Sequence, residues 1–252
     1  MSVYPMNPLF TTRNSVHEPR LLAHRGYAVD GPENSLAAFI AAGSKRFWAI
    51  ETDVWMTADE VLVCNHDATI DAMYDGTGSI REMTWQEILQ YTINKGNHVE
   101  VLPLEQRKMA TFEQYLRICR YYGSVPFIEL KATHIVKPVI EMVKAYNMED
   151  YAVISTTSLP MLQEVRQLTT RLYIHHILSH MDNALALKEL GHAGIQLDYA
   201  DVSKVPESDV QQLHKLGLQV CIRCQDTEEG IKQAIEIGMD YVPTNTIHRL
   251  TV

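Results

Sequence analysis

The strongest constraint on the fold is a regular alternation of short apolar runs with longer stretches of helical pattern. The chain has 252 residues, and eight strand-like apolar runs recur along it, at 21–23, 47–50, 125–130, 151–155, 172–175, 194–197, 219–222 and 241–243. Helix-like stretches separate most of them, at 36–40, 135–146, 159–167, 183–190, 207–216 and 227–237. Strands that alternate with helices favour parallel pairing. The pattern therefore predicts an α/β fold, a (β/α)8 TIM barrel, for which about 250 residues is typical.

We expect one domain over residues 1–252, with one interruption. Residues 67–110 break the alternation with a glycine-containing turn at 75–78, a helix-like run at 81–91 and a loop-like stretch at 94–103. We interpret 67–110 as a small insertion near the barrel mouth, after the second strand and its hairpin. Substrate contact and a surface excursion without catalytic use are both open for this segment.

Ionisable residues follow directly after two of the early apolar runs. His24 and Arg25 come after 21–23, and Glu51 and Asp53 come after 47–50. Alternation along a strand puts Glu51 and Asp53 on the same face. Two carboxylates on one face predict a site for a cation that prefers oxygen ligands. In barrels of this type the chemistry lies at the carboxyl ends of the strands, where these residues are expected.

A hairpin is expected to bring a histidine to the same place. The apolar run 54–57 turns through 58–60 and resumes at 61–66, which ends at His66. A two-residue loop would set His66 opposite Glu51, and a three-residue loop would set it opposite Thr52. Directly opposed residues have Cβ atoms about 5 Å apart. Either register therefore predicts an imidazole beside the carboxylate pair.

These motifs together resemble those of the glycerophosphodiester phosphodiesterase family. The family's four motifs occur here in order, as His24-Arg25-Gly26, Pro32-Glu33-Asn34-Ser35, Glu51-Thr52-Asp53 and His66-Asp67, with Ser35 in place of the usual Thr. More weakly, the runs 127–131 and 238–241 are similar to the family's E-x-K strand and last strand. The resemblance covers residues 20–248, and it implies the same barrel fold.

The resemblance also implies a role for each of seven residues. His24 and His66 would be the general acid and base, Arg25 and Lys131 would hold phosphate oxygens, and Glu51, Asp53 and Glu129 would bind a divalent cation. Hydrolysis of a phosphodiester gains from a Lewis acid and from a proton donor to the leaving oxygen. Carboxylate ligands favour Mg²⁺ or Ca²⁺ over zinc. The implied reaction releases glycerol 3-phosphate and an alcohol from a glycerophosphodiester.

Each role has a purely structural alternative. His24 and Arg25 could be a capped strand end, and Glu51 with Asp53 could pair with Arg or Lys inside the fold, although buried carboxylates are costly unless compensated. Glu129 and Lys131 could satisfy only each other. The residues 33–35 could simply begin a helix, since Asn and Ser are good N-caps. Glu33 is therefore left out of the predicted cation ligands, and Asp67 could be a turn residue.

Two departures from the family pattern concern the substrate. Ile222-Arg223-Cys224-Gln225 stands where the family usually has Trp-Thr-Val-Asn, and Thr244-Asn245 stands where Thr-Asp is common. Arg223 could bind an anionic head group or pair with Asp226. The alternative functions are hydrolysis of another phosphodiester, of lysophospholipase D or sugar phosphodiester type, and a catalytically silent ligand-binding barrel.

Composition mainly excludes classes of partner and site. A formal net charge of −9 and the lack of a basic patch argue against nucleic acid and anionic membranes as general partners. No apolar run approaches the roughly 20 residues of a spanning helix, so no stable membrane anchor and a cytoplasmic location are expected. The CxxC pair, Cys221 and Cys224, is expected on opposite faces of a strand, which argues against a zinc or redox role. The sequence predicts no oligomeric state.

Overall fold

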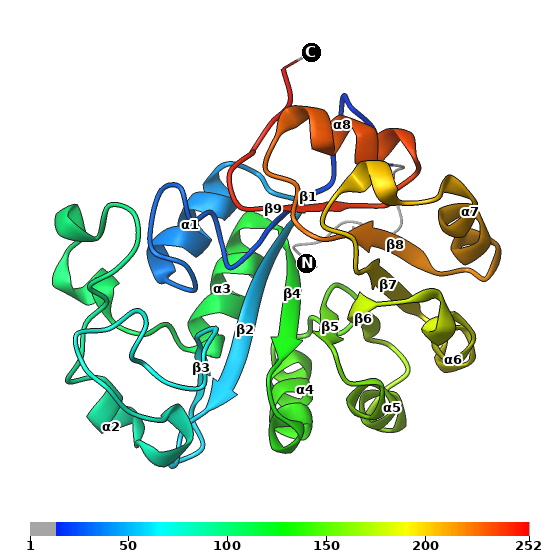
Figure 1. Ribbon diagram of the computed structural model, residues 1–252. Helices are drawn as coiled ribbons and strands as arrows, with labels where there is room; N and C mark the ends of the chain where they lie inside the picture. Colours follow the sequence, from blue (N-terminus) through cyan, green and yellow to red (C-terminus); the bar gives the residue numbers. More distant parts are fainter. Residues whose placement is uncertain (1–13, 252) are drawn as a thin grey trace.

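The computed structural model describes residues 14–251, and it contains the predicted barrel (Figure 1). Eight parallel strands form a nearly closed sheet in the order β8-β7-β6-β5-β4-β2-β1-β9, and β3 pairs with β2 outside this ring. Two backbone hydrogen bonds link the ends of the ring, from Asp240 to Val220 at 2.8 Å and from Gln225 to Pro243 at 2.9 Å. The strands are β1 (Leu21–Ala23), β2 (Ala49–Met56), β3 (Leu62–Cys64), β4 (Val125–Leu130), β5 (Val153–Thr156), β6 (Tyr173–Ser179), β7 (Ala193–Leu197), β8 (Gln219–Ile222) and β9 (Val242–Thr244).

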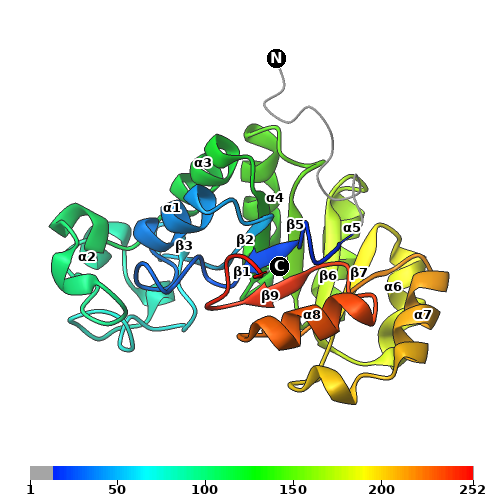
Figure 2. The ribbon, with the colours of Figure 1, turned by 90° about the horizontal axis from the view of Figure 1, so that it is seen from above.

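Helices other than α2 cover the outside of the barrel, and Figure 2 shows them around the strands, with α2 set apart in the segment 67–110. They are α1 (Leu36–Ser44), α2 (Trp85–Ile88), α3 (Phe112–Tyr122), α4 (Val136–Ala145), α5 (Leu159–Leu168), α6 (Ala184–Leu190), α7 (Glu207–Lys215) and α8 (Glu228–Glu236). Ser35 caps α1, because its side-chain oxygen accepts a hydrogen bond from the backbone of Ala38 at 3.2 Å. None of the helices in residues 14–251 is both long and apolar enough to span a bilayer.

The hairpin has the register of the longer of the two predicted loops. Trp55 lies opposite Val63 in the antiparallel β2–β3 pair. The backbone of Thr57 donates to Val61 at 3.0 Å, so the loop has three residues, and its last one, Glu60, has a φ of 64°. Since β3 ends at Cys64, His66 lies two residues beyond the paired strands.

The segment 67–110 packs as a small layer on the outer side of β3 and α1 (Figures 1 and 2). Its own apolar cluster is formed by residues such as Ile70, Ile80, Ile88 and Ile93. The predicted helix at 81–91 is much shorter, because Thr84 has an extended backbone and begins α2 as an N-cap through a capping box with Glu87. The run is therefore divided into a 3₁₀ turn at 80–82 and the four residues of α2.

Apolar side chains fill the interior of the barrel below the carboxyl ends of its strands. This inner cluster comprises Leu22, Ala49, Val125, Phe127, Val153, Tyr173, Cys221 and Tyr241. His175 lies among them, and its Nδ1 is 2.7 Å from the Tyr241 hydroxyl. Burial lowers the pKa of His175 to about 3, so its ring is neutral at pH 7.

Candidate active site

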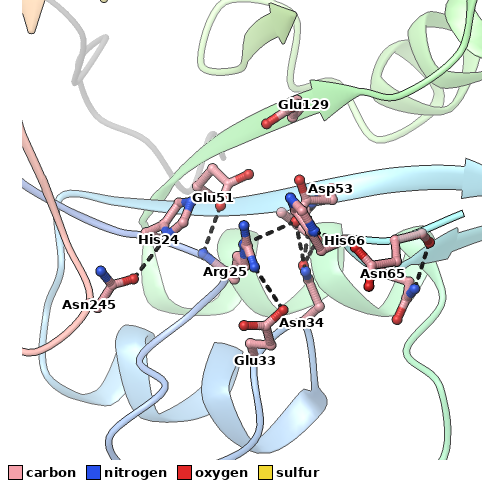
Figure 3. Close-up of polar contacts among 12 residues, drawn as sticks. His24, Arg25, Glu33, Asn34, Glu51, Asp53, Asn65, His66, Glu129 and Asn245 are labelled. Atoms are coloured by element: carbon pink, nitrogen blue, oxygen red, sulfur yellow. Dashed lines mark hydrogen bonds and ion pairs between the residues drawn. The ribbon is translucent and has the colours of Figure 1, made fainter. Parts of the chain in front are cut away.

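A cavity of about 470 Å³ opens where the strands end, and six of the seven predicted site residues line it. His24 and Arg25 follow β1, Glu51 lies in β2, His66 follows β3, and Glu129 and Lys131 lie at the end of β4. Asp53, the seventh, is buried in β2 and is not a lining residue. The volume falls in the range of small-molecule sites. Figure 3 shows six of the seven side chains, all except Lys131, gathered from separate strands and loops.

Glu51, Asp53 and Glu129 form a carboxylate cluster. The register of β2 with β4 sets Asp53 beside Glu129, and Glu51 lies on the same face as Asp53. One oxygen from each of the three carboxylates lies within 4.8 Å of the others. Three carboxylates this close repel one another strongly unless cations compensate them. The cluster therefore has the donors and the spacing that a divalent cation requires.

Lys131 supplies part of this compensation. Its ammonium lies 2.8 Å from Asp53 Oδ1 and 2.6 Å from Glu129 Oε1, so Lys131 and Glu129 do not satisfy only each other. Burial by itself would raise the pKa of Asp53, but Lys131, then Asn34 and Arg25, outweigh it and lower this pKa. Asp53 is thus held as a carboxylate. For Glu129, burial and the charge of Asp53 prevail over Lys131 and raise the pKa.

Glu51 is the poorly compensated member of the cluster. Its Oε2 accepts a hydrogen bond from the backbone of Arg25 at 2.7 Å, but its Oε1 is buried without any hydrogen-bond partner among residues 14–251. Burial, followed by the charges of Asp53 and Glu129, raises its pKa well above the usual range. Mg²⁺ and Ca²⁺ bind such oxygen atoms, so the residues present fit a divalent cation.

The loop after β1 holds the guanidinium of Arg25 beside the carboxylate cluster. Arg25 has a φ of 57°, and Gly26 follows with a φ of 79° and a Cβ position only 2.8 Å from Ala38, so the turn requires glycine there. The turn directs the Arg25 guanidinium between two carboxylates, with Nη1 2.9 Å from Glu33 and Nε 3.6 Å from Asp53. Glu33 thus pairs with Arg25 and is not part of the carboxylate cluster.

Asn34 positions the cluster from below, a role that the sequence did not reveal. Its Nδ2 donates to Asp53 Oδ2 at 2.8 Å, and its Oδ1 accepts from the Thr52 hydroxyl at 2.8 Å. Asn34 is buried and has a φ of 52°, a region that Asn tolerates better than most residues. The motif 32–35 therefore does more than begin α1.

The first predicted catalytic histidine, His24, is oriented from β9. His24 Nδ1 lies 2.9 Å from Asn245 Oδ1, and Asn245 donates from Nδ2 to Asp226 at 2.8 Å. Because a carboxylate only accepts, the amide nitrogen must face Asp226 and the amide oxygen must face His24. His24 Nδ1 therefore carries a hydrogen. Burial lowers the pKa of His24, but interactions with Cys224 and Asn245 outweigh this and raise it to about 9.

The second predicted histidine, His66, lies on the loop beyond β3. Its Nδ1 is 2.8 Å from Asp67 Oδ1, so Asp67 orients the ring and is not simply a turn residue. Trp55 donates from its indole to the His66 carbonyl at 3.2 Å. Asn65 holds the next turn through hydrogen bonds to Asp67 and Thr69. His66 itself lines the cavity and is more exposed than the carboxylate cluster.

The structure excludes one of the two alternatives for Arg223 and overturns the prediction for the CxxC pair. Arg223 does not pair with Asp226, which is occupied by Thr244 and Asn245, but contacts Asp198 at 3.2 Å. Cys221 and Cys224 do not lie on opposite faces, because β8 ends at Ile222 and both cysteines line the cavity. No described residue of 67–110 lines the cavity, and substrate contact by this segment stays a prediction.

Comparison with known proteins identifies the family. The profile of the Glycerophosphoryl diester phosphodiesterase family matches residues 24–249. A glycerophosphodiester phosphodiesterase of Caldanaerobacter subterraneus subsp. tengcongensis is 26% identical over 237 residues, 89% of this chain and 93% of that protein. Glycerophosphodiester phosphodiesterase 1 of Bos taurus is 33% identical over 132 residues, which is 50% of this chain but only 40% of that protein.

Solved structures agree with the fold. Glycerophosphodiester phosphodiesterase from Agrobacterium tumefaciens superposes with a TM-score of 0.77 at 23% identity, covering 90% of this chain and 97% of that one. A phosphodiesterase from Oleispira antarctica, in complex with the product sn-glycerol-3-phosphate, superposes with a TM-score of 0.77 at 21% identity, covering 91% and 94%. The chain therefore belongs to the glycerophosphoryl diester phosphodiesterase family and is an enzyme of the phosphoric diester hydrolase class.

Proposed function

We propose that this protein is a metal-dependent phosphodiesterase that hydrolyses glycerophosphodiesters to glycerol 3-phosphate and an alcohol. The observation that carries the proposal is the unpartnered oxygen of Glu51, buried within the carboxylate cluster and beside two histidines that line the same cavity. A site built only for stability would not leave that oxygen without a partner. The product bound in the Oleispira antarctica structure supports the same reaction for this chain.

Glu51, Asp53 and Glu129 would hold the cation, either Mg²⁺ or Ca²⁺. When bound, it would withdraw charge from the phosphate oxygens and offset the repulsion between an acidic protein and an anionic substrate. Arg25 adds a guanidinium at the same edge of the cavity. Lys131, whose ammonium contacts Asp53 and Glu129, would share its charge with a phosphate oxygen, since it also lines the cavity.

His24 and His66 would move the protons. Hydrolysis needs one group that removes a proton from the attacking nucleophile, either water or a hydroxyl of the substrate, and one that gives a proton to the leaving oxygen. The hydrogen on His24 Nδ1 is committed to Asn245, so proton transfer to or from the substrate would use Nε2. His66 Nδ1 is in the same way committed to Asp67. Each ring thus has one nitrogen held by the protein and one available for proton transfer.

The reaction can be tested by measuring glycerol 3-phosphate release from glycerophosphocholine and glycerophosphoethanolamine. We expect release with Mg²⁺ or Ca²⁺ and its loss in chelator. Equal release with and without chelator would contradict the metal dependence, and no release from any glycerophosphodiester by the folded protein would contradict the proposed function. The single domain over 1–252, the role of 67–110 at the mouth and a cytoplasmic location belong to the same proposal.

A further inference from the structure

The cavity has a second half, opposite the carboxylate cluster, that the reaction itself does not require. Its lining comes from β5 to β8 and the loops that follow them, and includes Ser155, Thr157, Leu178, Gln196 and Arg223. We call this set the far half of the cavity. Among the described lining residues of the far half, Arg223 is the only one with a permanently charged side chain. An arm of a substrate that extends away from the carboxylate cluster toward β8 would therefore meet one cation.

Arg223 is held loosely enough to bind a ligand. Its side chain is 48% exposed, and its Nε lies 3.2 Å from Oδ1 of Asp198, which follows β7 and is itself 32% exposed. Asp198 is the one ion-pair partner of this guanidinium among residues 14–251. Exposed ion pairs of this kind contribute little to stability, so the pair can accommodate a third group at small cost. A guanidinium contacted mainly at Nε still presents its terminal nitrogens.

Arg223 lines the cavity, and Asp198, which is not itself a lining residue, lies 3.2 Å from its Nε and is 32% exposed. A carboxylate matches the two terminal nitrogens of Arg223, because the planar fork of a guanidinium fits a carboxylate with two parallel hydrogen bonds. An ammonium matches Asp198. By contrast, the aromatic side chains that line the cavity, Phe127 and Tyr241, belong to the inner cluster at its floor and do not surround Arg223. A quaternary ammonium, which favours aromatic faces, would meet a cation here.

We propose that Arg223 and Asp198 bind the alcohol part of the substrate, and that the enzyme prefers glycerophosphodiesters whose alcohol is an α-amino acid, such as glycerophosphoserine. This proposal rests on the proposed function, since it assumes that the phosphate lies at the carboxylate cluster. The glycerol part is common to all these substrates, so the alcohol part is what a charged pair can select.

The test compares kcat/KM for glycerophosphoserine, glycerophosphoethanolamine, glycerophosphocholine and glycerophosphoglycerol with Mg²⁺ or Ca²⁺. We expect glycerophosphoserine to be the preferred substrate. Arg223→Gln should reduce the ratio of kcat/KM for glycerophosphoserine to that for glycerophosphoglycerol by about 10- to 100-fold, mainly through KM, as expected for hydrogen bonds to a charged group. Asp198→Asn should likewise reduce the ratio of kcat/KM for glycerophosphoethanolamine to kcat/KM for glycerophosphoglycerol.

Arg117→Gln is the matched control, because it removes the same charge from the exposed surface of α3 and should leave all ratios unchanged. No preference for glycerophosphoserine, or an equal loss on every substrate in Arg223→Gln, would overturn the proposal while leaving the proposed function intact. If no diester is hydrolysed, the proposed function fails instead. The affinities of His66→Ala protein for glycerophosphoserine and glycerophosphocholine, measured by calorimetry with and without Arg223→Gln, then test the binding site independently of turnover. Arg223→Gln should weaken the binding of glycerophosphoserine only.

Discussion

His24 donates its Nδ1 hydrogen to Asn245 Oδ1 over 2.9 Å, and Asn245 is itself held by Asp226. The chain from carboxylate to amide to imidazole determines which ring nitrogen of His24 carries hydrogen. It also connects β9 and the loop after β8 to β1, across the point where the barrel closes. Asn245, which lies near the end of the sequence, thus helps to orient His24 at the start of the barrel.

Replacing Asn245 with Ala should reduce kcat about 10- to 100-fold with a smaller change in KM. The ring of His24 would lose the acceptor that orients it, and such orienting partners typically contribute this much to a site. The measurement is a comparison of kcat and KM on one glycerophosphodiester. Gln211→Ala, an exposed change on α7, is the control. A rise in KM with an unchanged kcat would instead show that Asn245 contacts the substrate and does not orient His24.

His24 should bind a proton with a pKa of about 9 in chelator. Cys224 contributes the largest interaction that raises this pKa, so Cys224→Ala should lower it. Because the native state holds this proton more tightly than an unfolded histidine with a pKa of about 6.5, the resulting stability is complete below about pH 6.5 and is lost as the pH rises through 9.

The value can be measured by following the His24 ring signals in NMR titrations, with His24→Gln protein to assign them. A midpoint near 6.5 in the wild-type protein would contradict the stabilising contacts of His24. If the midpoint is the same in Cys224→Ala protein, Cys224 does not contribute to the raised pKa of His24.

Alanine at His24 or His66 should lower kcat by about 10²- to 10⁴-fold, the usual contribution of a general acid or base. The melting temperature of His66→Ala should change little, because the side chain is 39% exposed and contacts the adjacent Asp67. His214→Ala, which removes an imidazole from α7, should keep normal turnover. Near-normal turnover in either active-site variant would remove that histidine from the mechanism.

Local patterns predicted the barrel and the grouping of five of the seven site residues, and the family resemblance added Glu129 and Lys131. Apolar runs mark the strands, and polar residues after them must gather at one end of a parallel barrel. Partners that come from distant strands could not be found in this way. Asn34 resembled a helix start, and Asn245 was only a departure from the family pattern, because their hydrogen bonds to Asp53 and His24 depend on how the loops fold. The pairing of Arg223 with Asp198 could not be predicted either, because it depends on how the ends of β7 and β8 lie relative to each other.

Asn34→Ala should destabilise the protein by about 1–3 kcal/mol, the cost of leaving a buried acceptor without its donor. Asp53 Oδ2 and the Thr52 hydroxyl would both lose a partner. In a chain of this size the melting temperature should fall by about 2–4 °C for each kcal/mol. Calorimetry and a cation titration would measure stability and affinity together, and an unchanged affinity would limit Asn34 to a structural role.

Glu51→Gln should stabilise the protein in chelator and abolish the gain in stability that a cation provides. Burial raises the pKa of Glu51, so the native state holds this proton more tightly than the unfolded chain does, and stability is lost as the pH rises above about 4.5 toward that raised pKa. A neutral amide avoids this loss and can donate a hydrogen bond to the neighbouring carboxylates. We expect a melting temperature a few degrees above wild type at neutral pH in chelator.

With Mg²⁺ or Ca²⁺ the order should reverse, because a ligand that binds only the native state stabilises it in proportion to its affinity. The wild-type protein should gain stability and Glu51→Gln should not, whereas Glu236→Gln on the exposed surface of α8 should follow the wild type in both conditions. A purely structural Glu51 would instead make Glu51→Gln less stable in chelator and leave the response to cations unchanged. The crossing of the two stabilities thus separates a carboxylate retained for cation binding from one retained for folding.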